Sequence, residues 1–262
     1  MFFYNLLYFY CNLNLVFVSL KMEKAFFISD IHFGAGNTTE EKEKLTRFTN
    51  FLNHINQPEN QLYIVGDLFD FWFEYRYVVP NQNFPVLYQI HKLIENDVSV
   101  HFLPGNHDGW IRNFFAQQVQ IKVHPEVFTT EIQSKKVLLF HGDGISKQDT
   151  GYRILKKIFR NPINIFLYRL LHPDLGIPLA KFMSMGSRKH TAGKVFDDEQ
   201  DYLNFALEQF EQGVDYVIVG HSHKPMCKKV DNHILLNSGD WIDHFSYGKL
   251  EAGNLTLEYW NS

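Results

Sequence analysis

Short runs of β-branched and aromatic residues alternate along the chain with longer segments in which apolar residues recur every three or four positions. The short runs predict buried strands, and the longer segments predict helices between them. The predicted helices are Glu40–Ile55, Pro85–Glu95 and Asp198–Glu211. The predicted strands are Lys24–Ser29, Gln61–Val65, Val98–Leu103, Val137–Phe140, Asp215–Val219, Ile234–Asn237 and Leu255–Tyr259. This alternation predicts a layered α/β domain.

Residues 152–194, called the cap from here on, interrupt this alternation. Apolar residues including Ile158 and Phe159 recur at helical spacing among Lys and Arg, and Ile163–Leu171 is nearly all apolar. Because proline interrupts helices, Pro162, Pro173 and Pro178 are expected to divide the cap into short pieces. We therefore predict a helical insertion over a single domain of residues 22–262.

The first 21 residues do not fit the domain pattern. Met1–Leu20 is apolar and aromatic but has neither a basic start nor a small-residue cleavage site, so a secretory signal is poorly supported. A stretch of about 20 residues could just span a bilayer, which leaves a membrane anchor as one alternative. We favour Met22 as the true start, with residues 1–21 as an extension upstream of it, because Met22 directly precedes a predicted strand.

Charge is unevenly distributed over the chain. The net charge of the 262 residues is −4, with 25 basic and 29 acidic residues. The cap holds nine basic residues and one acidic residue, a net charge of +8, so the remainder carries −12. Such a division suggests one surface that meets anions. The two cysteines are far apart, which excludes a disulfide framework and favours a reducing compartment.

Five predicted strands lead directly into short clusters that contain Asp, His or Asn, four of them together with Gly. Because the carboxyl ends of strands in open α/β sheets border the ligand site, these side chains are expected to share one crevice. The clusters are Asp30-Ile31-His32, Gly66-Asp67, Gly105-Asn106-His107-Asp108, His141-Gly142-Asp143 and Gly220-His221-Ser222-His223.

These residue types suit a pair of divalent metal ions. Carboxylate, imidazole and amide ligands favour Mn²⁺, Fe²⁺ or Zn²⁺ over Ca²⁺. Two ions about 3.5–4 Å apart share a bridging ligand and lower the pKa of a water between them, which suits attack on phosphorus. Each cluster alone has an ordinary explanation, since Gly-Asp is usually a turn and Asn106 could occupy a left-handed turn. The joint occurrence of all five clusters favours the metal site.

The five clusters together resemble those of the calcineurin-like metallophosphoesterases. The resemblance implies a four-layer α/β/β/α sandwich. It also implies that His107 protonates the leaving group and is oriented by Asp108. Two divalent ions, with Mn²⁺ as the expected metal, would be held by two ligand sets that share Asp67: Asp30, His32, Asp67 and His223, and Asp67, Asn106, His141 and His221.

A narrower resemblance points to the UDP-2,3-diacylglucosamine pyrophosphatases of lipid A synthesis. It rests on Gly66–Trp72 and on His141-Gly142-Asp143 followed by Asp149-x-Gly151-Tyr152. That family implies hydrolysis to UMP and 2,3-diacylglucosamine 1-phosphate. Two positions depart from its pattern, because His107 replaces the usual Arg and Thr191 replaces the usual Asn. The substrate-binding residues it implies are Asn106, Asp149, Ser187, Thr191, Lys194 and His221.

The cap has two interpretations. Apolar residues including Phe166, Leu170 and Leu171 could hold acyl chains while the cations meet phosphates or an anionic membrane surface. Alternatively, the cap is an ordinary amphipathic insertion with solvated Lys and Arg. The charge division favours the first, with a lipid-linked nucleotide as substrate, a location at the cytoplasmic face of the membrane, no nucleic acid and no evident protein partner. The aromatic run Phe69–Tyr77 could line a pocket, although core packing is expected for most of it.

Two other functions remain open at this stage. The chain could be a different phosphodiesterase or nucleotide phosphatase, which His107 favours and the basic apolar cap disfavours. It could also be a non-catalytic scaffold of the same fold, which the complete set of ligands disfavours.

Overall fold

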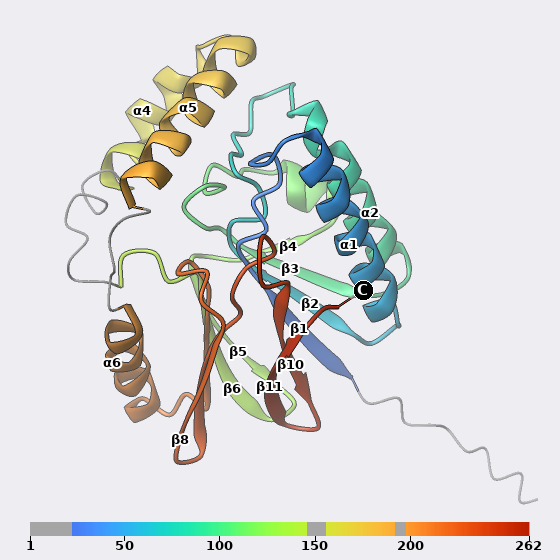
Figure 1. The fold of residues 1–262 in the computed structure, drawn as a ribbon, viewed down its shortest axis with the longest axis vertical. Helices are drawn as coiled ribbons and strands as arrows, with labels where there is room; N and C mark the ends of the chain where they lie inside the picture. Colours follow the sequence, from blue (N-terminus) through green and yellow to red (C-terminus); the bar gives the residue numbers. More distant parts are fainter. Residues whose placement is uncertain (1–22, 146–155, 192–197, 262) are drawn as a thin grey trace, which may run out of the picture.

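The computed structural model describes residues 23–145, 156–191 and 198–261, with side chains described for residues 156–182 and 199–261 of the last two ranges. Two β-sheets pack face to face at the centre (Figure 1). The six-stranded sheet has the order β11 (Asn254–Tyr259), β10 (Ser246–Glu251), β1 (Lys24–Ile28), β2 (Gln61–Val65), β3 (Ser99–Leu103) and β4 (Lys122–Val123). The five-stranded sheet has the order β5 (Val127–Ile132), β6 (Lys135–Phe140), β7 (Tyr216–Val219), β9 (His233–Asn237) and β8 (Met226–Val230).

Helices cover the outer face of each sheet. In Figure 1, α1 (Thr38–Ile55) and α2 (Phe84–Glu95) lie on one side of the paired sheets, and α6 (Asp198–Glu211) lies on the other. The 3₁₀ turn η1 (Asn81–Asn83) precedes α2, and the short π-helix η2 (Phe115–Val119) follows β3. The predicted four-layer α/β/β/α fold is therefore confirmed.

The side chains of β1 show how the sequence builds these layers. Successive side chains of a strand point to opposite faces of the sheet. Phe26 and Ile28 accordingly pack toward the helix layer, whereas Ala25 and Phe27 pack between the two sheets. A third apolar cluster, including Tyr202 of α6, joins the second sheet to that helix. Each sheet is thus buried on both faces, which explains the nearly continuous apolar runs of the sequence.

Three parallel strands in each sheet bring their carboxyl ends to a common edge. β1 pairs in parallel with β2, and β2 with β3, so Ile28, Ile64 and Phe102 lie side by side. In the second sheet, β6 pairs in parallel with β7 and β7 with β9. The residues that follow these strands are the clusters singled out in the sequence, apart from those after β9.

All seven predicted strands and all three predicted helices are present, with small differences at their ends. α1 begins at Thr38, two residues early, because the Asn37 side chain accepts hydrogen bonds from the backbone amides of Thr39 and Glu40 and caps the helix. Four strands were not predicted: β4, β5, β8 and β10. β5 and β8 are edge strands with alternating exposure, and β10 has the polar sequence Ser-Tyr-Gly-Lys-Leu-Glu.

The described part of the cap contains a helical segment at residues 156–159 and the helices α4 (Pro162–Arg169) and α5 (Pro173–Thr191). Helices α4 and α5 stand beside the sandwich in Figure 1. Pro162 and Pro173 begin these helices as expected, but Pro178 lies inside α5 and does not end it. The expectation that Pro178 divides the cap is therefore wrong. Pro178 is the sixth residue of α5, so its missing amide removes one internal hydrogen bond, but the helix continues past it to Thr191.

Aromatic residues attach the cap to the domain. Phe71, Phe73 and Tyr75 form a buried cluster against which Ile165 and Tyr168 of α4 pack, together with Ile177 and Ala180 of α5. The aromatic run Phe69–Tyr77 is thus divided, because Phe69 and Trp72 fill the main core. Among the residues that the structure describes, no helix combines the length and apolar character needed to cross a membrane.

Candidate active site

Backbone hydrogen bonds fix the strand-end loops against one another. The amides of Ile31 and His32 donate to the carbonyl of Asp67, at 2.9 and 3.0 Å, which joins the loops after β1 and β2. In the second sheet, the amide of Gly220 donates to the carbonyl of His141 at 3.0 Å. These loops therefore hold their side chains at the edge where the two sheets meet.

Two glycines permit this close approach. A Cβ at Gly105 would lie 2.6 Å from the backbone nitrogen of Asp67, and a Cβ at Gly220 would lie 2.6 Å from Asp30 Oδ2. Any larger residue at either position would displace a carboxylate of the site.

Asp30, His32 and His223 form the first group of predicted metal ligands. Asp30 Oδ1 lies 3.6 Å from His32 Nε2 and 3.4 Å from His223 Nε2. The other carboxylate oxygen of Asp30 accepts a hydrogen bond of 2.8 Å from the backbone amide of His221. Asp30 is thus oriented by the backbone through one oxygen and presents the other to the two imidazoles.

Asp67 lies between this group and the second one. Its Oδ2 is 3.6 Å from His32 Nε2 and 3.3 Å from His141 Nε2, while its Oδ1 accepts from the backbone amide of His107 at 2.9 Å. Asn106 Oδ1 lies 3.2 Å from His141 Nε2. The ring of His221 lies 5.2 Å from that of His141. All seven predicted ligands therefore converge, and Asp67 is the residue with access to both groups.

Buried atoms without hydrogen-bond partners indicate that a cation belongs here. Asp30 Oδ1 and both ring nitrogens of His32 are buried and have no hydrogen-bond partner among the described residues. Buried polar atoms normally have such partners, so these three exceptions need an explanation. Carboxylate and imidazole atoms that face one another at 3.3–3.6 Å fit divalent metal ions. The residues present therefore fit the metals that the sequence predicts.

The backbone at these ligands is strained. Non-glycine residues rarely adopt a positive φ, and such residues concentrate at functional sites. Five predicted ligands have this conformation: Asp30 (53°), His32 (49°), Asp67 (54°), His221 (70°) and His223 (59°). The hydrogen bonds between the loops hold this strain, which points the side chains into the site.

Burial and mutual attraction shift the pKa values of these groups. Burial opposes ionisation of Asp30, but His141, His223 and His32 outweigh it and hold its pKa below the usual value. Burial opposes protonation of His141, but Asp67 and Asp30 raise its pKa well above normal. Burial, followed by the nearby His141, lowers the pKa of His221 to about 4. At neutral pH the carboxylates are anionic and His221 is neutral, and metal binding would displace a proton from His141.

Neighbouring groups orient two of the histidines. His141 Nδ1 lies 2.8 Å from the carbonyl of Val65, which can only accept, so Nδ1 carries the proton and Nε2 faces the site. The Asp240 carboxylate accepts from the backbone amides of residues 242–244 through Oδ1, while Oδ2 lies 3.8 Å from His223 Nδ1 and 2.8 Å from His244 Nδ1. Asp240 was not predicted. It follows β9 in Ser238-Gly239-Asp240, so the strand-end rule could have found it.

His107 lies beside the predicted metal ligands, with its ring 4.8 Å from that of His32. Its Nδ1 donates to the backbone carbonyl of Asp70 at 2.8 Å, which fixes the orientation of the ring. Asp108 was expected to orient His107. Instead, its carboxylate accepts from the backbone amides of Gly105 and residues 67–69, at 2.8–3.4 Å.

Asp108 therefore fixes the loops after β2 and β3, one of which carries His107, and its expected role in orienting His107 stays a prediction. Burial, followed by the charge of Asp67, raises the pKa of Asp108 to about 7, while the amides of Gly105 and Phe69 act in the opposite direction.

The expected substrate-binding residues are placed only in part. Asn106 and His221 lie among the metal ligands. Ser187 and Thr191 lie in α5, but their side chains fall outside the described residues, as do Asp149 and Lys194 altogether.

The cations of the cap are partly engaged in ion pairs. Lys156 Nζ lies 2.5 Å from Oδ2 of the buried Asp143 and 3.1 Å from Glu126, and Arg160 also pairs with Glu126. Lys181 donates to the side chain of Gln82. Part of the charge of the cap thus attaches it to the domain, which the net charge of +8 could not show.

A pocket of about 320 Å³ connects the metal site with the cap. Asn106 and His107 line one end, and Lys156 and Arg160 contribute positive charge. The remaining lining is mainly apolar and comes from Phe71, Phe73, Trp110, Ile158, Phe159, Ile165, Tyr168, Leu179 and Ala180.

Comparison with known proteins agrees with this geometry. The model of the calcineurin-like phosphoesterase family matches residues 24–225. A protein of Porphyromonas gingivalis named UDP-2,3-diacylglucosamine hydrolase is 32% identical over 254 residues, which cover 90% of this chain and 97% of that protein. Proteins of the same name from Hahella chejuensis and Pseudomonas fluorescens are 30% and 29% identical, and cover 88% and 82% of this chain and 95% and 86% of their own lengths.

Proposed function

Because the chain belongs to the calcineurin-like phosphoesterase family, we propose that it hydrolyses UDP-2,3-diacylglucosamine to UMP and 2,3-diacylglucosamine 1-phosphate. It is a metal-dependent hydrolase. The substrate is the one that its relatives are named for, and those relatives are similar over most of both chains.

The pocket between the metal site and the cap carries this proposal. It places apolar side chains from Ile158 to Ala180 directly beside Asn106 and His107. A diacylated sugar phosphate needs this combination, because its phosphate must reach the metal ligands while its acyl chains leave water. Each buried methylene of an acyl chain contributes roughly 0.8 kcal/mol, so even partial burial of a chain would give substantial binding.

Two divalent ions, expected to be Mn²⁺, would supply an activated water and neutralise charge on the phosphate. The residues of the chain hold and orient the reacting groups. Asp67, whose Oδ2 faces both His32 and His141, would be the ligand that the two sets share. Asn106 and His221 lie beside the second position, where they can also contact the substrate phosphate. The Nδ1–H group of His107 donates a hydrogen bond to the Asp70 carbonyl. This orientation would let a protonated Nε2 act as the acid toward the departing oxygen.

The structure changes which residues we expect to hold acyl chains. Phe166, Leu170 and Leu171 are exposed and do not line the pocket beside the metal site. Ile158 and Phe159 do line it, with Ile165 and Leu179 from the two helices of the cap. We therefore assign acyl-chain binding to this inner set. Ser187, Thr191, Asp149 and Lys194 stay candidates for contacts with the substrate head group.

Peripheral association with an anionic membrane follows from the same substrate, because a diacylated sugar resides in a bilayer. The exposed apolar residues of α4 and the uneven charge of the sequence support this association. We propose that the enzyme works at the cytoplasmic face of the cell membrane.

Product identification tests the proposed reaction directly. Purified protein with Mn²⁺ and UDP-2,3-diacylglucosamine should release UMP and 2,3-diacylglucosamine 1-phosphate in equal amounts, as measured by mass spectrometry. Release of UDP would contradict cleavage within the pyrophosphate. The presence of His107, where the narrower family has Arg, favours a second candidate, a phosphodiesterase of the wider family. Hydrolysis of simple phosphodiesters without cleavage of the lipid would support that candidate.

A further inference from the structure

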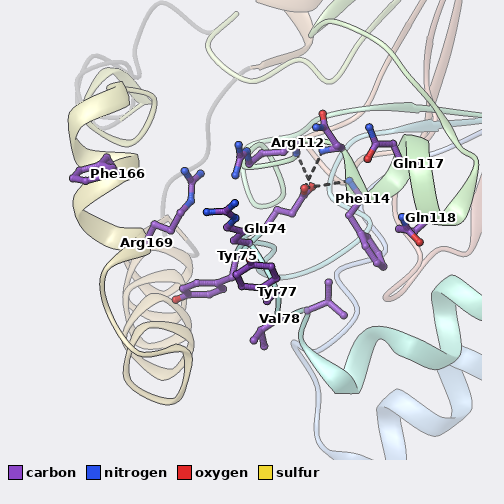
Figure 2. A pocket seen from close by; sticks show the side chains of 13 residues that line it. Glu74, Tyr75, Tyr77, Val78, Arg112, Phe114, Gln117, Gln118, Phe166 and Arg169 are labelled. Carbon is purple, nitrogen blue, oxygen red and sulfur yellow. Dashed lines mark hydrogen bonds between the residues drawn. The ribbon is translucent and has the colours of Figure 1, made fainter.

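A second pocket lies away from the predicted metal ligands. It has a volume of about 740 Å³ and is bordered by residues 74–79, residues 112–118 and α4 (Figure 2). None of the seven predicted metal ligands lines it. Three arginines do, Arg76, Arg112 and Arg169, and we call this site the arginine pocket.

Among the residues that the structure describes, the three arginines have no acidic partner. Among the residues that line the pocket, Glu74 carries the acidic group. Its carboxylate accepts hydrogen bonds from the backbone amides of Arg112, Asn113 and Phe114 at 2.6–3.1 Å. Within the described residues, none of the three guanidinium groups forms an ion pair, and Arg169 Nε is buried without a hydrogen-bond partner. In Figure 2 the side chains of Arg112 and Arg169 extend toward each other from opposite walls. Like charges that converge without a counter-charge favour a bound anion.

Aromatic rings hold two of these arginines in place. The Arg169 guanidinium carbon lies 5.8 Å from the ring centre of Phe73, and that of Arg76 lies 5.2 Å from the ring centre of Tyr77. Guanidinium groups packed on rings keep their planar hydrogen-bonding edges free. Such edges bind phosphate in a two-pronged manner, so the chemistry of the pocket points to a phosphate group.

Exposed apolar side chains around the arginine pocket indicate the source of the phosphate. Tyr77 is 85% exposed and Phe166 is 57% exposed, and both line the pocket. Ile163 and Leu167 of α4 and its C-cap residue Leu170, all exposed, continue this apolar surface. Exposed aromatic and aliphatic side chains beside a cationic site are typical of a surface that meets a lipid bilayer.

We propose that the arginine pocket binds the phosphate of an anionic phospholipid and so docks α4 on the membrane. The proposal rests on the membrane association put forward above, but not on the identity of the substrate. It names the site of that association and separates it from the catalytic pocket on the far side of the Phe73–Tyr168 contact.

Vesicle binding by a triple variant tests the proposal. Arg76→Gln, Arg112→Gln and Arg169→Gln are combined, and binding is measured by sedimentation with phosphatidylglycerol-containing vesicles and with pure phosphatidylcholine vesicles. Each basic residue near an anionic surface contributes about fivefold, so the triple variant should bind anionic vesicles on the order of 100-fold more weakly. The matched control combines Lys42→Gln, Lys122→Gln and Lys229→Gln, three exposed cations outside the pocket with the same total charge.

Three results would overturn the proposal. Equal losses in the two triple variants would mean that overall charge, not the pocket, attracts the membrane. Equal binding of wild-type protein to both vesicle types would exclude recognition of an anionic phospholipid. The third result is that the arginine variant loses binding of a soluble nucleotide or inorganic phosphate while its vesicle binding stays unchanged. That result would assign the pocket to a soluble anion. Hydrolysis of a small phosphodiester should stay normal in both variants, which separates this test from that of the proposed reaction.

Discussion

The metal-binding edge of the sheets and the cap are built in opposite ways. At the edge, Asp30, His32, Asp67 and His141 are buried, and backbone hydrogen bonds orient the two carboxylates. In the cap, α4 has no fully buried residue and exposes Ile163, Phe166 and Leu167. The difference teaches that the reacting geometry is held rigidly, whereas substrate and membrane contacts are carried by a helical insertion that rests on a few aromatic contacts.

The largest effect should come from Asp67, which faces both ligand groups. Asp67→Ala removes the shared carboxylate and should abolish hydrolysis of the lipid and of a small phosphodiester alike. Elemental analysis should show two metal ions per wild-type chain and fewer in the variant. Glu208→Ala, an exposed acid on α6, is the control and should retain activity and metal. Normal activity of Asp67→Ala would remove the basis for a bridged metal pair.

His107 should have the next largest effect. A general acid contributes about 10²–10⁴-fold to rate, and most when the leaving group is poor. His107→Ala should therefore lower kcat strongly for the lipid pyrophosphate and much less for an activated aryl ester. His107→Arg should retain more activity on the lipid than His107→Ala does. Equal losses on both substrates would indicate that His107 positions phosphate instead.

Asp240 should affect metal affinity more than it affects chemistry. Groups that orient metal ligands are typically worth 10–100-fold in affinity or activity. Asp240→Asn keeps an oxygen for the amides of residues 242–244 but weakens the contact with His223 and His244. The variant should need roughly 10–100 times more Mn²⁺ for half-maximal activity and recover at saturating metal. A defect that excess metal does not repair would rule out this role.

The smallest expected effect is confined to the cap. Ile165→Ser with Leu179→Ser removes apolar surface from the inner pocket and should raise KM for the diacylated substrate about tenfold, because each lost methylene contact is worth roughly 0.8 kcal/mol. The small phosphodiester should be hydrolysed normally. Phe166→Ser with Leu170→Ser and Leu171→Ser is the matched control on the outer face, and should weaken vesicle binding while leaving KM in detergent nearly unchanged. If the outer variant raises KM more than the inner one, the assignment of the acyl pocket is wrong.

The layered fold and the convergence of the ligands could be predicted because both follow from strands. Buried parallel strands give apolar runs, and their carboxyl ends share an edge, so Asp30, Asp67 and His141 could be placed together before any coordinates. Strands without that signature were missed. β10 reads as polar, although Gly248 lets it lie against Phe27, with a Cβ at Gly248 only 3.3 Å from that side chain.

Contacts between elements far apart in sequence could not be predicted in the same way. The partner of His107 Nδ1 is a backbone carbonyl at residue 70, and the Asp108 carboxylate turns toward amides on another loop. Such pairings depend on how two loops fit together and leave no periodic pattern. For the same reason, the sequence does not distinguish the apolar residues of the cap that line the inner pocket from those on its outer face. Ile165 and Phe166 are neighbours in the sequence but line different pockets.

A comparison of kcat/KM for two substrates tests the central claim most directly. Purified protein is given UDP-2,3-diacylglucosamine and a chromogenic phosphodiester, with chelator and then with Mn²⁺ restored, and kcat/KM is measured for each. Burial of several acyl methylenes should make the lipid the better substrate by at least about 10³-fold, and both activities should disappear with the chelator and return with Mn²⁺. Equal or higher efficiency on the diester, or full activity in the chelated sample, would contradict the account.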